Sequence, residues 1–393
     1  MSYRVNPGLA AELARFGGQT LSKCFNCGNC TAVCGLSKNQ TVFPRKIIRY
    51  LQLGLEEKLL ESPEPWLCYY CGTCSDTCPR EAQPGELMMA TRRWLTSRYD
   101  WTGLSKKLYL SEAWEAGLLA ATALAVLACF MVPGMFGVPF GFFALDEAAR
   151  QHVRLDIFAP KDWIHRADWA LAAGLLALLS LNALRMIVAV RRGFGRSSVP
   201  LLTWLRDAYQ PMLHLLTQKR WLECDNDTRF RWLQHFLRVT GYATMFLLVV
   251  AFLPAFQRDG AEFHYTAIFG YYGTVVLMWV TVAAMRGRWR KTEQIHKFSQ
   301  ISDWMFLVLL FLTSLSGILL HVARLLDLPW PTYILYVVHL MIAVSMLVIE
   351  VPFGKWLHLV FRPVAKYMVA VREAAIERPV HVTPHHPLTA RLR

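Results

Sequence analysis

The sequence CFNCGNCTAVC at residues 24–34 recurs in form as CYYCGTCSDTC at residues 68–78. Each stretch has the spacing C-x2-C-x2-C-x3-C, which places four thiolates where they can surround a cubane of iron and sulfide. Two such runs therefore predict two [4Fe–4S] clusters. A pair of zinc sites is the alternative, but zinc usually takes two well-separated C-x2-C pairs, so the compact repeat favours clusters.

The fourth cysteine of each run decides how the two clusters share their ligands. In two-cluster ferredoxins this cysteine ligates the cluster of the other run. The same crossing assigns the first cluster to Cys24, Cys27, Cys30 and Cys78, and the second cluster to Cys68, Cys71, Cys74 and Cys34. Pro79 follows the second run as the pattern expects, whereas Gly35 stands after the first run. That glycine changes the turn but removes no ligand.

Size and charge restrict the class of protein. The chain has 393 residues, ten cysteines and a net charge of +14. A long chain with a polar N-terminus and no cleavable signal peptide does not fit a secreted disulfide framework, so we expect the clusters in the reducing cytoplasm. The positive charge could indicate nucleic acid. Because basic residues collect in the cytoplasmic loops of membrane proteins, we expect the lipid bilayer as the partner and no nucleic acid.

Six apolar segments follow residue 110, each near the roughly 20 residues that cross a bilayer as a helix. We expect them at residues 113–133, 168–190, 236–257, 265–285, 303–322 and 332–353. The loops after the second and fourth segments and the C-terminal tail are rich in Lys and Arg. The opposite loops carry few, among them Arg150, Arg154, Lys161, Arg258 and Arg324. The positive-inside rule therefore predicts a multi-pass protein of the cytoplasmic (inner) membrane with both termini in the cytoplasm.

The sequence predicts an all-α fold, because no alternating strand pattern occurs before the apolar segments. In the first part, helices are expected over Phe43–Leu60 and from Pro84 to about Arg98. Residues 193–231 look amphipathic and are expected to lie on the membrane surface or to contact a partner. The expected parts are a cytoplasmic helical domain with both clusters at residues 1–105, a six-helix transmembrane bundle at 106–375 and a disordered tail at 376–393.

Four histidines lie near the ends of the apolar segments, where ionisable residues are costly and often functional. His235 and His358 lie on the inner side, and His321 and His339 lie on the outer side. Two imidazoles at one depth can be the axial ligands of a low-spin haem b. The pairs therefore predict an inner and an outer haem b. An interfacial anchor is the alternative for each histidine alone, but four at matched depths favour haem.

The spacing between His339 and His358 supports one haem in each leaflet, because 19 residues of continuous helix rise roughly 28 Å. Arginines on the same helix faces are expected to contact the haem propionates; they are Arg238, Arg324 and Arg362. His264, at the outer start of the fourth segment, is the rival of His321 as a haem ligand or a quinone contact. Glu350 is either a satisfied helix-end carboxylate or part of a proton path to a quinol site.

Two stretches resemble known families. The stretch CFNCGNCTAVC…WLCYYCGTCSDTCPREAQPGEL resembles the iron–sulfur C subunit of heterodisulfide reductases, a helical ferredoxin. The stretch HLMIAVSMLVIEVPFGKWLH is similar to the last haem-bearing span of the nitrate reductase gamma subunit and of the heterodisulfide reductase E subunit. A histidine near each end of that span holds haem b, which maps onto His339 and His358. The two halves in one chain are similar to the membrane subunits of quinone-interacting membrane-bound oxidoreductases.

This resemblance implies an N-terminal α-helical ferredoxin domain, two [4Fe–4S] clusters, two haems b and a quinone or quinol substrate, with menaquinone as the quinone. It also implies cytoplasmic flavin and iron–sulfur partner subunits and, through them, adenylylsulfate reductase in dissimilatory sulfur metabolism. In the nitrate reductase subunit both partner histidines lie on one earlier span, about ten residues apart. In this chain the corresponding position after His235 is occupied by Met245. His321 therefore replaces that histidine by depth and not by motif.

The sequence thus predicts an oxidoreductase subunit that carries electrons between the quinone pool and cytoplasmic partners, and that is incomplete as an enzyme without them. No residue pattern for covalent catalysis, no Gly-rich phosphate loop and no flavin motif occurs. A membrane subunit of a heterodisulfide- or trisulfide-reductase complex is the alternative, disfavoured because the CCG-type cysteine doublet is absent. An alternative of another class is a haem-free membrane anchor for a ferredoxin domain.

Overall fold

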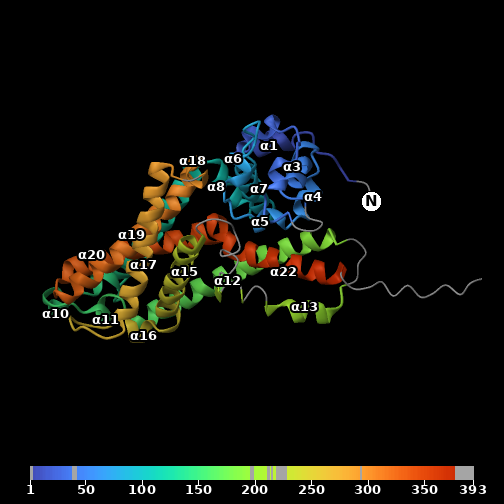
Figure 1. The fold of residues 1–393 in the computed structure, drawn as a ribbon. Coiled ribbons are helices and arrows are strands. Elements are labelled where there is room, and N and C mark those ends of the chain that lie inside the picture. The colour runs from blue at the N-terminus through green and yellow to red at the C-terminus, as the bar shows by residue number, and fades with distance from the viewer. Residues whose placement is uncertain are drawn as a thin grey trace, which may run out of the picture.

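The computed structural model describes residues 3–37, 42–194, 199–209, 213, 216–217, 228–292 and 294–376. These residues form helices joined by turns and loops, and they contain no strand. The all-α fold predicted from the sequence is confirmed. Figure 1 shows a group of short N-terminal helices (blue) next to a group of much longer helices.

The N-terminal helices are short because turns interrupt them. They are α1 (Leu9–Arg15), η1 (Gln19–Lys23), α2 (Asn29–Ala32), α3 (Arg45–Gln52), α4 (Glu56–Leu60), α5 (Glu64–Leu67), α6 (Thr73–Asp76), α7 (Pro84–Tyr99) and α8 (Leu104–Leu110). The single helix expected over Phe43–Leu60 is wrong, because Gly54 has a φ of 67° and separates α3 from α4. A Cβ at Gly54 would lie 2.3 Å from the carbonyl oxygen of Asn6, so only glycine fits this turn. The second expected helix is confirmed as α7.

Six helices within the described part of the chain are long and apolar enough to cross a bilayer. They are α9 (Glu112–Met135), α12 (Lys161–Arg192), α15 (Thr228–Phe246) with the π-helical turn η4 (Leu247–Ala251), α17 (Ala267–Arg290), α19 (Ile301–Leu325), and α20 (Pro329–Ser345) with the π-helical turn η5 (Met346–Glu350) and α21 (Val351–Phe353). The six apolar segments predicted from the sequence are therefore confirmed as helices of spanning length.

Short elements connect the long helices. They are η2 (Gly141–Ala144), α10 (Glu147–Gln151), α11 (Leu155–Phe158), α13 (Leu201–Asp207), α16 (Leu253–Phe256), α18 (Gln294–Lys297), η6 (Lys355–Leu357) and α22 (His358–Ile376). Within the predicted amphipathic stretch, Trp204 of α13 packs against Tyr367 of α22, whose hydroxyl donates to the Trp204 carbonyl at 2.7 Å. Much of that stretch, and the tail predicted to be disordered, lie outside the described residues.

The sixth span stops before His358. Helix α21 ends at Phe353, and Gly354 is extended with φ −101° and ψ −150°. The turn η6 then leads into α22, which contacts α5 and α12 instead of continuing the span. Figure 1 shows α22 (red) running below the N-terminal helices. The assumption of one continuous helix from His339 to His358 is therefore wrong, and the 28 Å rise does not apply.

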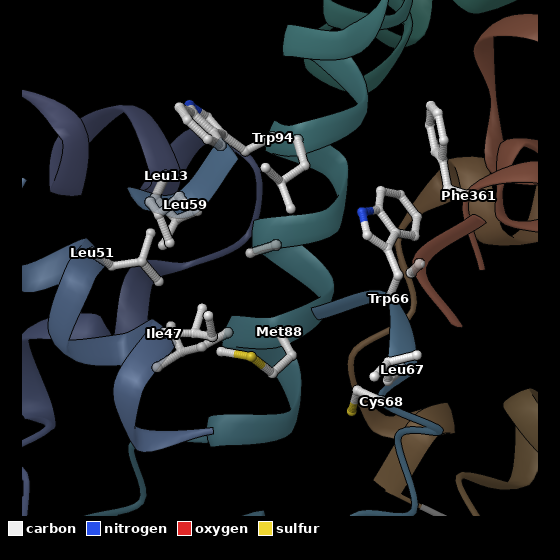
Figure 2. Close-up of a cluster of buried hydrophobic side chains, with 14 of the residues drawn as sticks. Leu13, Ile47, Leu51, Leu59, Trp66, Leu67, Cys68, Met88, Trp94 and Phe361 are labelled. Carbon is white, nitrogen blue, oxygen red and sulfur yellow. The ribbon is translucent and has the colours of Figure 1, made fainter. Parts of the chain in front are cut away.

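One hydrophobic core joins the N-terminal helices to the membrane helices, with buried residues from α1, α3, α7, α12 and α22. Phe361 of α22 is fully buried, and its ring centroid lies 4.8 Å from that of Trp66 and 5.4 Å from that of Tyr99. Figure 2 shows Trp66 and Phe361 facing each other across this core. Arg185 of α12 adds a polar contact, because its Nε donates to the Tyr99 carbonyl at 2.7 Å.

Replacement of Phe361 by alanine tests this packing of α22 against the N-terminal helices. Because the substitution Phe361→Ala leaves a cavity between Trp66 and Tyr99, we expect a loss of about 3–5 kcal/mol of stability. The measurement is the thermal unfolding midpoint of the purified protein, with proteolysis of the N-terminal helices as a second readout. Leu359→Ala is the matched control, because Leu359 lies on the same helix and is 37% exposed. Equal losses in both variants would contradict the assignment.

Candidate metal centres

The two cysteine runs fold into two copies of one loop. The second residue after the first cysteine is left-handed in both copies, with φ of 61° at Asn26 and 56° at Tyr70. The glycine two positions later is also left-handed, with φ of 92° at Gly28 and 91° at Gly72. Each glycine precedes a short helix, α2 or α6. Because glycine adopts this conformation without steric cost, the repeated C-x-x-C-G sequence determines the same turn twice.

The fourth cysteine of the second run lies with the first run. A pocket beside α2 is lined by Cys24, Cys27 and Cys30 and also by Cys78. Burial raises the pKa of the Cys30 thiol, and the neighbouring thiols of the other three cysteines raise it further. The structure thus brings together the four cysteines that the sequence assigns to the first cluster.

The fourth cysteine of the first run lies with the second run. Burial raises the pKa of Cys34 to about 11, and the nearby thiols of Cys68 and Cys71 add to this rise. Burial also raises the pKa of Cys74, and the thiols of Cys68, Cys71 and Cys34 contribute again. These four cysteines are the set that the sequence assigns to the second cluster.

The donor chemistry of both groups fits [4Fe–4S] clusters, which take four thiolates each. The backbone amide of Tyr70 donates to Cys68 Sγ, and that of Ala82 donates to Cys78 Sγ, each at 3.4 Å. Such bonds to ligand sulfurs orient the ligands and tune a cluster. In the described part of the chain no three Cys, His, Asp or Glu side chains are close enough to hold a single metal ion.

Two arginines converge on the backbone carbonyl of Cys68. Arg92 of α7 and Arg362 of α22 both donate to this oxygen, Arg362 at 3.0 Å. Burial lowers the pKa of Arg92 to about 9, and the Arg362 guanidinium lowers it further. Two guanidinium groups this close repel each other unless an anion lies nearby, and a cluster held by four thiolates is anionic. The pair of arginines therefore supports an anionic group at the second set of cysteines.

Arg362 points towards the cysteine loop. Besides the Cys68 carbonyl, its guanidinium lies 4.8 Å from the centroid of the Tyr69 ring. The sequence predicts a haem propionate as its contact, and the structure places its guanidinium between α22 and the second cysteine run. The second cysteine group is therefore tied directly to α22. In the first group, Cys27 is exposed, as is the neighbouring Phe25.

His358 begins α22, one turn before Arg362. Its Nδ1 donates to the carbonyl of Lys355, which leaves Nε2 available as a ligand atom. Burial lowers the pKa of His358 to about 4, and the Arg362 guanidinium is the second cause. The imidazole is therefore neutral at pH 7, as an axial haem ligand must be. Arg238, one turn after His235 on α15, also lowers this pKa, so α15 passes near His358.

His339 has a similar arrangement in α20, the first part of the sixth span. Its Nδ1 lies 2.9 Å from the Ser316 hydroxyl on α19, which again leaves Nε2 available. A Cβ on Gly317 would lie 3.2 Å from His339 Cε1, so the glycine keeps the space beside the imidazole open. The predicted partner, His321, differs because its Nε2 lies 2.8 Å from the Tyr271 hydroxyl. The structure thus presents a ligand atom at His339 but engages the corresponding atom of His321.

The remaining outer candidates have other contacts. His264 has Nε2 at 3.2 Å from an Arg258 nitrogen and Nδ1 at 2.9 Å from the Thr266 hydroxyl, so both ring nitrogens are engaged. Arg324 donates to the carbonyl of Gly260 at 2.6 Å and to that of Glu262 at 3.2 Å. It therefore holds the loop before α17. Both residues thus hold the loop between α16 and α17 in the structure.

Several residues that support these sites escaped sequence reasoning. Arg92 lies on α7, where no spacing rule connects it to Cys68, and Ser316 is one of many small polar residues in the spans. Glu115 stands near the start of α9, where it resembles an ordinary helix-start carboxylate. Its burial is the signal that distinguishes it, and burial is visible only in the fold.

Comparison with known proteins is consistent with the cysteine geometry. A family model described as a 4Fe-4S dicluster domain matches residues 20–82. The heterodisulfide reductase C-subunit-like protein of Archaeoglobus profundus is 36% identical over 92 residues, which are 23% of this chain and 49% of that protein. The iron–sulfur C subunit of the CoB–CoM heterodisulfide reductase of Methanopyrus kandleri is 36% identical over 154 residues, 39% of this chain and 67% of that protein.

A third relative extends the same group. The C subunit of the H(2):CoB-CoM heterodisulfide,ferredoxin reductase of Methanothermobacter marburgensis is 30% identical over 135 residues, 34% of this chain and 63% of that protein. The chain spans about half to two thirds of the length of the curated relatives it matches. No solved structure matches it significantly.

The crossed grouping of the cysteines predicts how single substitutions act. Cys78→Ser removes a ligand of the cluster held by Cys24, Cys27 and Cys30, so we expect loss of that cluster although Cys78 belongs to the second run. Electron paramagnetic resonance of the reduced protein and its sulfide content measure the loss, which should be about half of the sulfide. Cys129→Ser is the control, since Cys129 is exposed and lies in a span. Loss of the second cluster alone in Cys78→Ser would refute the crossing.

The available Nε2 atoms predict the effect of histidine substitutions. His358→Ala and His339→Ala should each remove part of the b-type α band in the reduced-minus-oxidised spectrum, because each removes the imidazole that would be an axial ligand of a haem b. His152→Ala is the control, because His152 pairs with Asp327 on the outer surface. An unchanged band in both His358→Ala and His339→Ala would remove these histidines as haem ligands.

Proposed function

We propose that this chain, which belongs to the family of heterodisulfide reductase C subunits through its iron–sulfur domain, is a membrane protein for electron transfer. It would connect quinone or quinol in the bilayer with cytoplasmic partner subunits. The six helices of spanning length supply the membrane part. Two [4Fe–4S] clusters and two haems b would carry the electrons.

The observation that carries this proposal is the contact between the second cysteine run and α22. Arg362 donates to the Cys68 carbonyl at 3.0 Å and lies one helical turn after His358. Phe361, its neighbour in sequence, is buried against Trp66 in the same core. The loop of the second cluster therefore contacts the same short segment, residues 358–362, that carries the proposed inner haem ligand.

The chain's own residues would hold and tune these groups. The two cysteine sets would bind the clusters, which supply one-electron transfer. The Nδ1 contacts of His358 and His339 fix their tautomers and leave Nε2 towards the iron of a haem b, which supplies one-electron transfer inside the bilayer. Arg92 and Arg362 place positive charge beside the second cysteine set. That charge stabilises the more negative, reduced form of a cluster.

The finer assignment is a member of a quinone-interacting membrane-bound oxidoreductase complex. In that assignment the quinone is menaquinone, the partners are cytoplasmic flavin and iron–sulfur subunits, and these connect to adenylylsulfate reductase in sulfur metabolism. The fusion of a cluster domain with a six-span membrane part in one chain supports it. Cys27 and Phe25 on the first cysteine run and Cys71 on the second are exposed, so a cytoplasmic partner could reach both runs.

A membrane component of a heterodisulfide-reducing complex is the second candidate. The names of the relatives favour it, since they are C subunits of heterodisulfide reductases or similar to them. Both candidates share the same electron path through the chain and differ in the partner that receives the electrons. The purified complex separates them, because the second candidate predicts that a disulfide substrate reoxidises the reduced chain.

Quinol reduction of the purified chain tests the proposal. A short-chain menaquinol should reduce a b-type haem and bleach the iron–sulfur absorbance, and the protein should contain about eight acid-labile sulfides. Arg362→Gln should leave haem reduction intact and slow cluster reduction on the order of tenfold, because a positive charge beside the cluster is lost. Stopped-flow absorbance separates the two rates.

The matched control is Arg372→Gln, because Arg372 lies on the same helix and pairs with Glu64 at 3.2 Å instead of contacting the cysteine loop. A preparation with clusters but no b-type band would leave the haem-free anchor as the function. Clusters and haem that menaquinol does not reduce would refute the quinone link.

A further inference from the structure

Two carboxyl groups from different spans meet in the interior at the inner end of the membrane helices. Glu115 of α9 is 2% exposed, and Glu350, the last residue of η5, is 1% exposed. Each carboxyl group is a direct electrostatic neighbour of the other. A carboxylate in the bilayer region is costly and is retained mainly where it has a function. Two carboxylates side by side increase that cost.

Apolar side chains lie near the pair in the same elements. Leu108, Leu119, Ile349 and Phe353 form a buried cluster of side chains from the same segments. Oε1 of Glu350 is buried and has no hydrogen-bond partner within the described residues. An unsatisfied buried oxygen costs about 1–3 kcal/mol. This oxygen is therefore in a position to take a proton or a ligand, and the fold does not occupy it with a structural contact.

The backbone around Glu350 is adapted to this placement. The π-helical turn η5 ends at Glu350, and π-helical turns are frequent at functional sites. At Gly354 a Cβ would lie 2.3 Å from Glu350 Oε2, so a larger residue would displace the carboxyl group. The amide of Gly354 donates to the Glu350 carbonyl at 3.0 Å. An irregular helix and a glycine thus combine to hold this carboxyl group in the interior.

The cation beside Glu115 is Lys355, which already forms an ion pair with another carboxylate. Lys355 of η6 pairs with Asp303 of α19, and its ammonium also lies near Glu115. Burial lowers the pKa of Lys355 well below its ordinary value, and the guanidinium groups of Arg93 and Arg288 lower it further. The Glu115–Glu350 pair therefore shares an already paired lysine and has no separate cation to neutralise it within the described residues.

Charged and titratable groups face the pair from several elements. Tyr109 of α8 lies near both carboxyl groups, and Glu112 of α9 and Lys355 of η6 lie near Glu115. Around Lys355 lie Arg93 of α7, Arg288 of α17, Glu86 of α7 and Asp303 of α19. Glu86 extends this set: it pairs with Arg93 at 3.0 Å and accepts from the Tyr70 hydroxyl at 2.9 Å. Tyr70 lies between Cys68 and Cys71. A continuous set of buried polar groups thus extends from the carboxyl pair to the second cysteine run.

We propose that Glu115 and Glu350 form a proton-binding site in which the two carboxyl groups hold one exchangeable proton at the cytoplasmic end of the membrane part. The inference rests on the proposed electron-transfer function, because an electron gained nearby is what drives proton uptake. The electron comes from a quinol or a chemical reductant. The proton comes from cytoplasmic water and forms an O–H bond with one carboxylate, so the added negative charge is balanced.

Infrared difference spectroscopy of the full-length protein in membranes tests the site. Reduction should produce a carbonyl band of a protonated carboxyl group, and this band should shift in D2O because the proton is exchangeable. Glu350→Gln and Glu115→Gln should each abolish or strongly reduce the band. Glu373→Gln is the matched control, because Glu373 is an exposed carboxylate on α22 at the same side of the membrane, and it should leave the band unchanged.

Two further measurements keep the inference separate from folding and from the proposed function. Cluster signals and haem absorbance must be normal in the variants, and Gly354→Ala should shift the band without removing either glutamate. Normal redox centres with a carboxyl band unchanged in both glutamine variants would refute the proton site alone. A wild-type protein without reducible centres would refute the electron-transfer function and, with it, the coupled proton.

Discussion

The burial of Phe361 between Trp66 and Tyr99 is the interaction on which the rest of the structure depends. The cysteine loops belong to the N-terminal group of helices, whose hydrophobic core continues into the long helices. Phe361 extends this core into α22, and Met186 and Val190 of α12 extend it into the second span. Figure 2 shows Cys68 next to Leu67 on the segment that carries Trp66. The second cysteine group is therefore fixed to the membrane helices by packing.

The parts of the fold that can be predicted from the sequence depend on local constraints. A cysteine spacing and a following glycine determine one turn, so the loops at Gly28 and Gly72 could be expected to match, and α2 and α6 are in contact as the repeat implies. The spans could be predicted because a bilayer requires a continuous apolar helix of sufficient length. Each of these features needs only neighbouring residues and the solvent. The crossed cysteine grouping follows from the pairing of two equal loops.

The features that escaped prediction depend on distant partners. The break at Gly54 follows from the close approach of Asn6, and the end of the sixth span at Phe353 follows from the contacts of α22 with α5 and α12. A spacing argument treats His339 to His358 as one helix and assigns Arg362 to the haem side. Only the first inference assumes that the helix continues through Gly354, because the second depends on the spacing between His358 and Arg362 within α22. Tertiary contacts decide whether the helix continues, because a glycine such as Gly354 can adopt either a helical or an extended conformation.

The distribution of buried charge distinguishes the two ends of the membrane part. The end next to the N-terminal helices, here called the inner end, contains Arg93, Glu115, Asp303, Glu350 and Lys355, all but the lysine less than 9% exposed. Replacing such groups by apolar residues often stabilises a protein, so their presence is better explained by chemistry that needs charge than by folding. The inner end is also where the cysteine loop contacts α22. The proposed proton site and the second cysteine group therefore lie at the same end of the bundle, whereas His339 lies towards the other end of the sixth span.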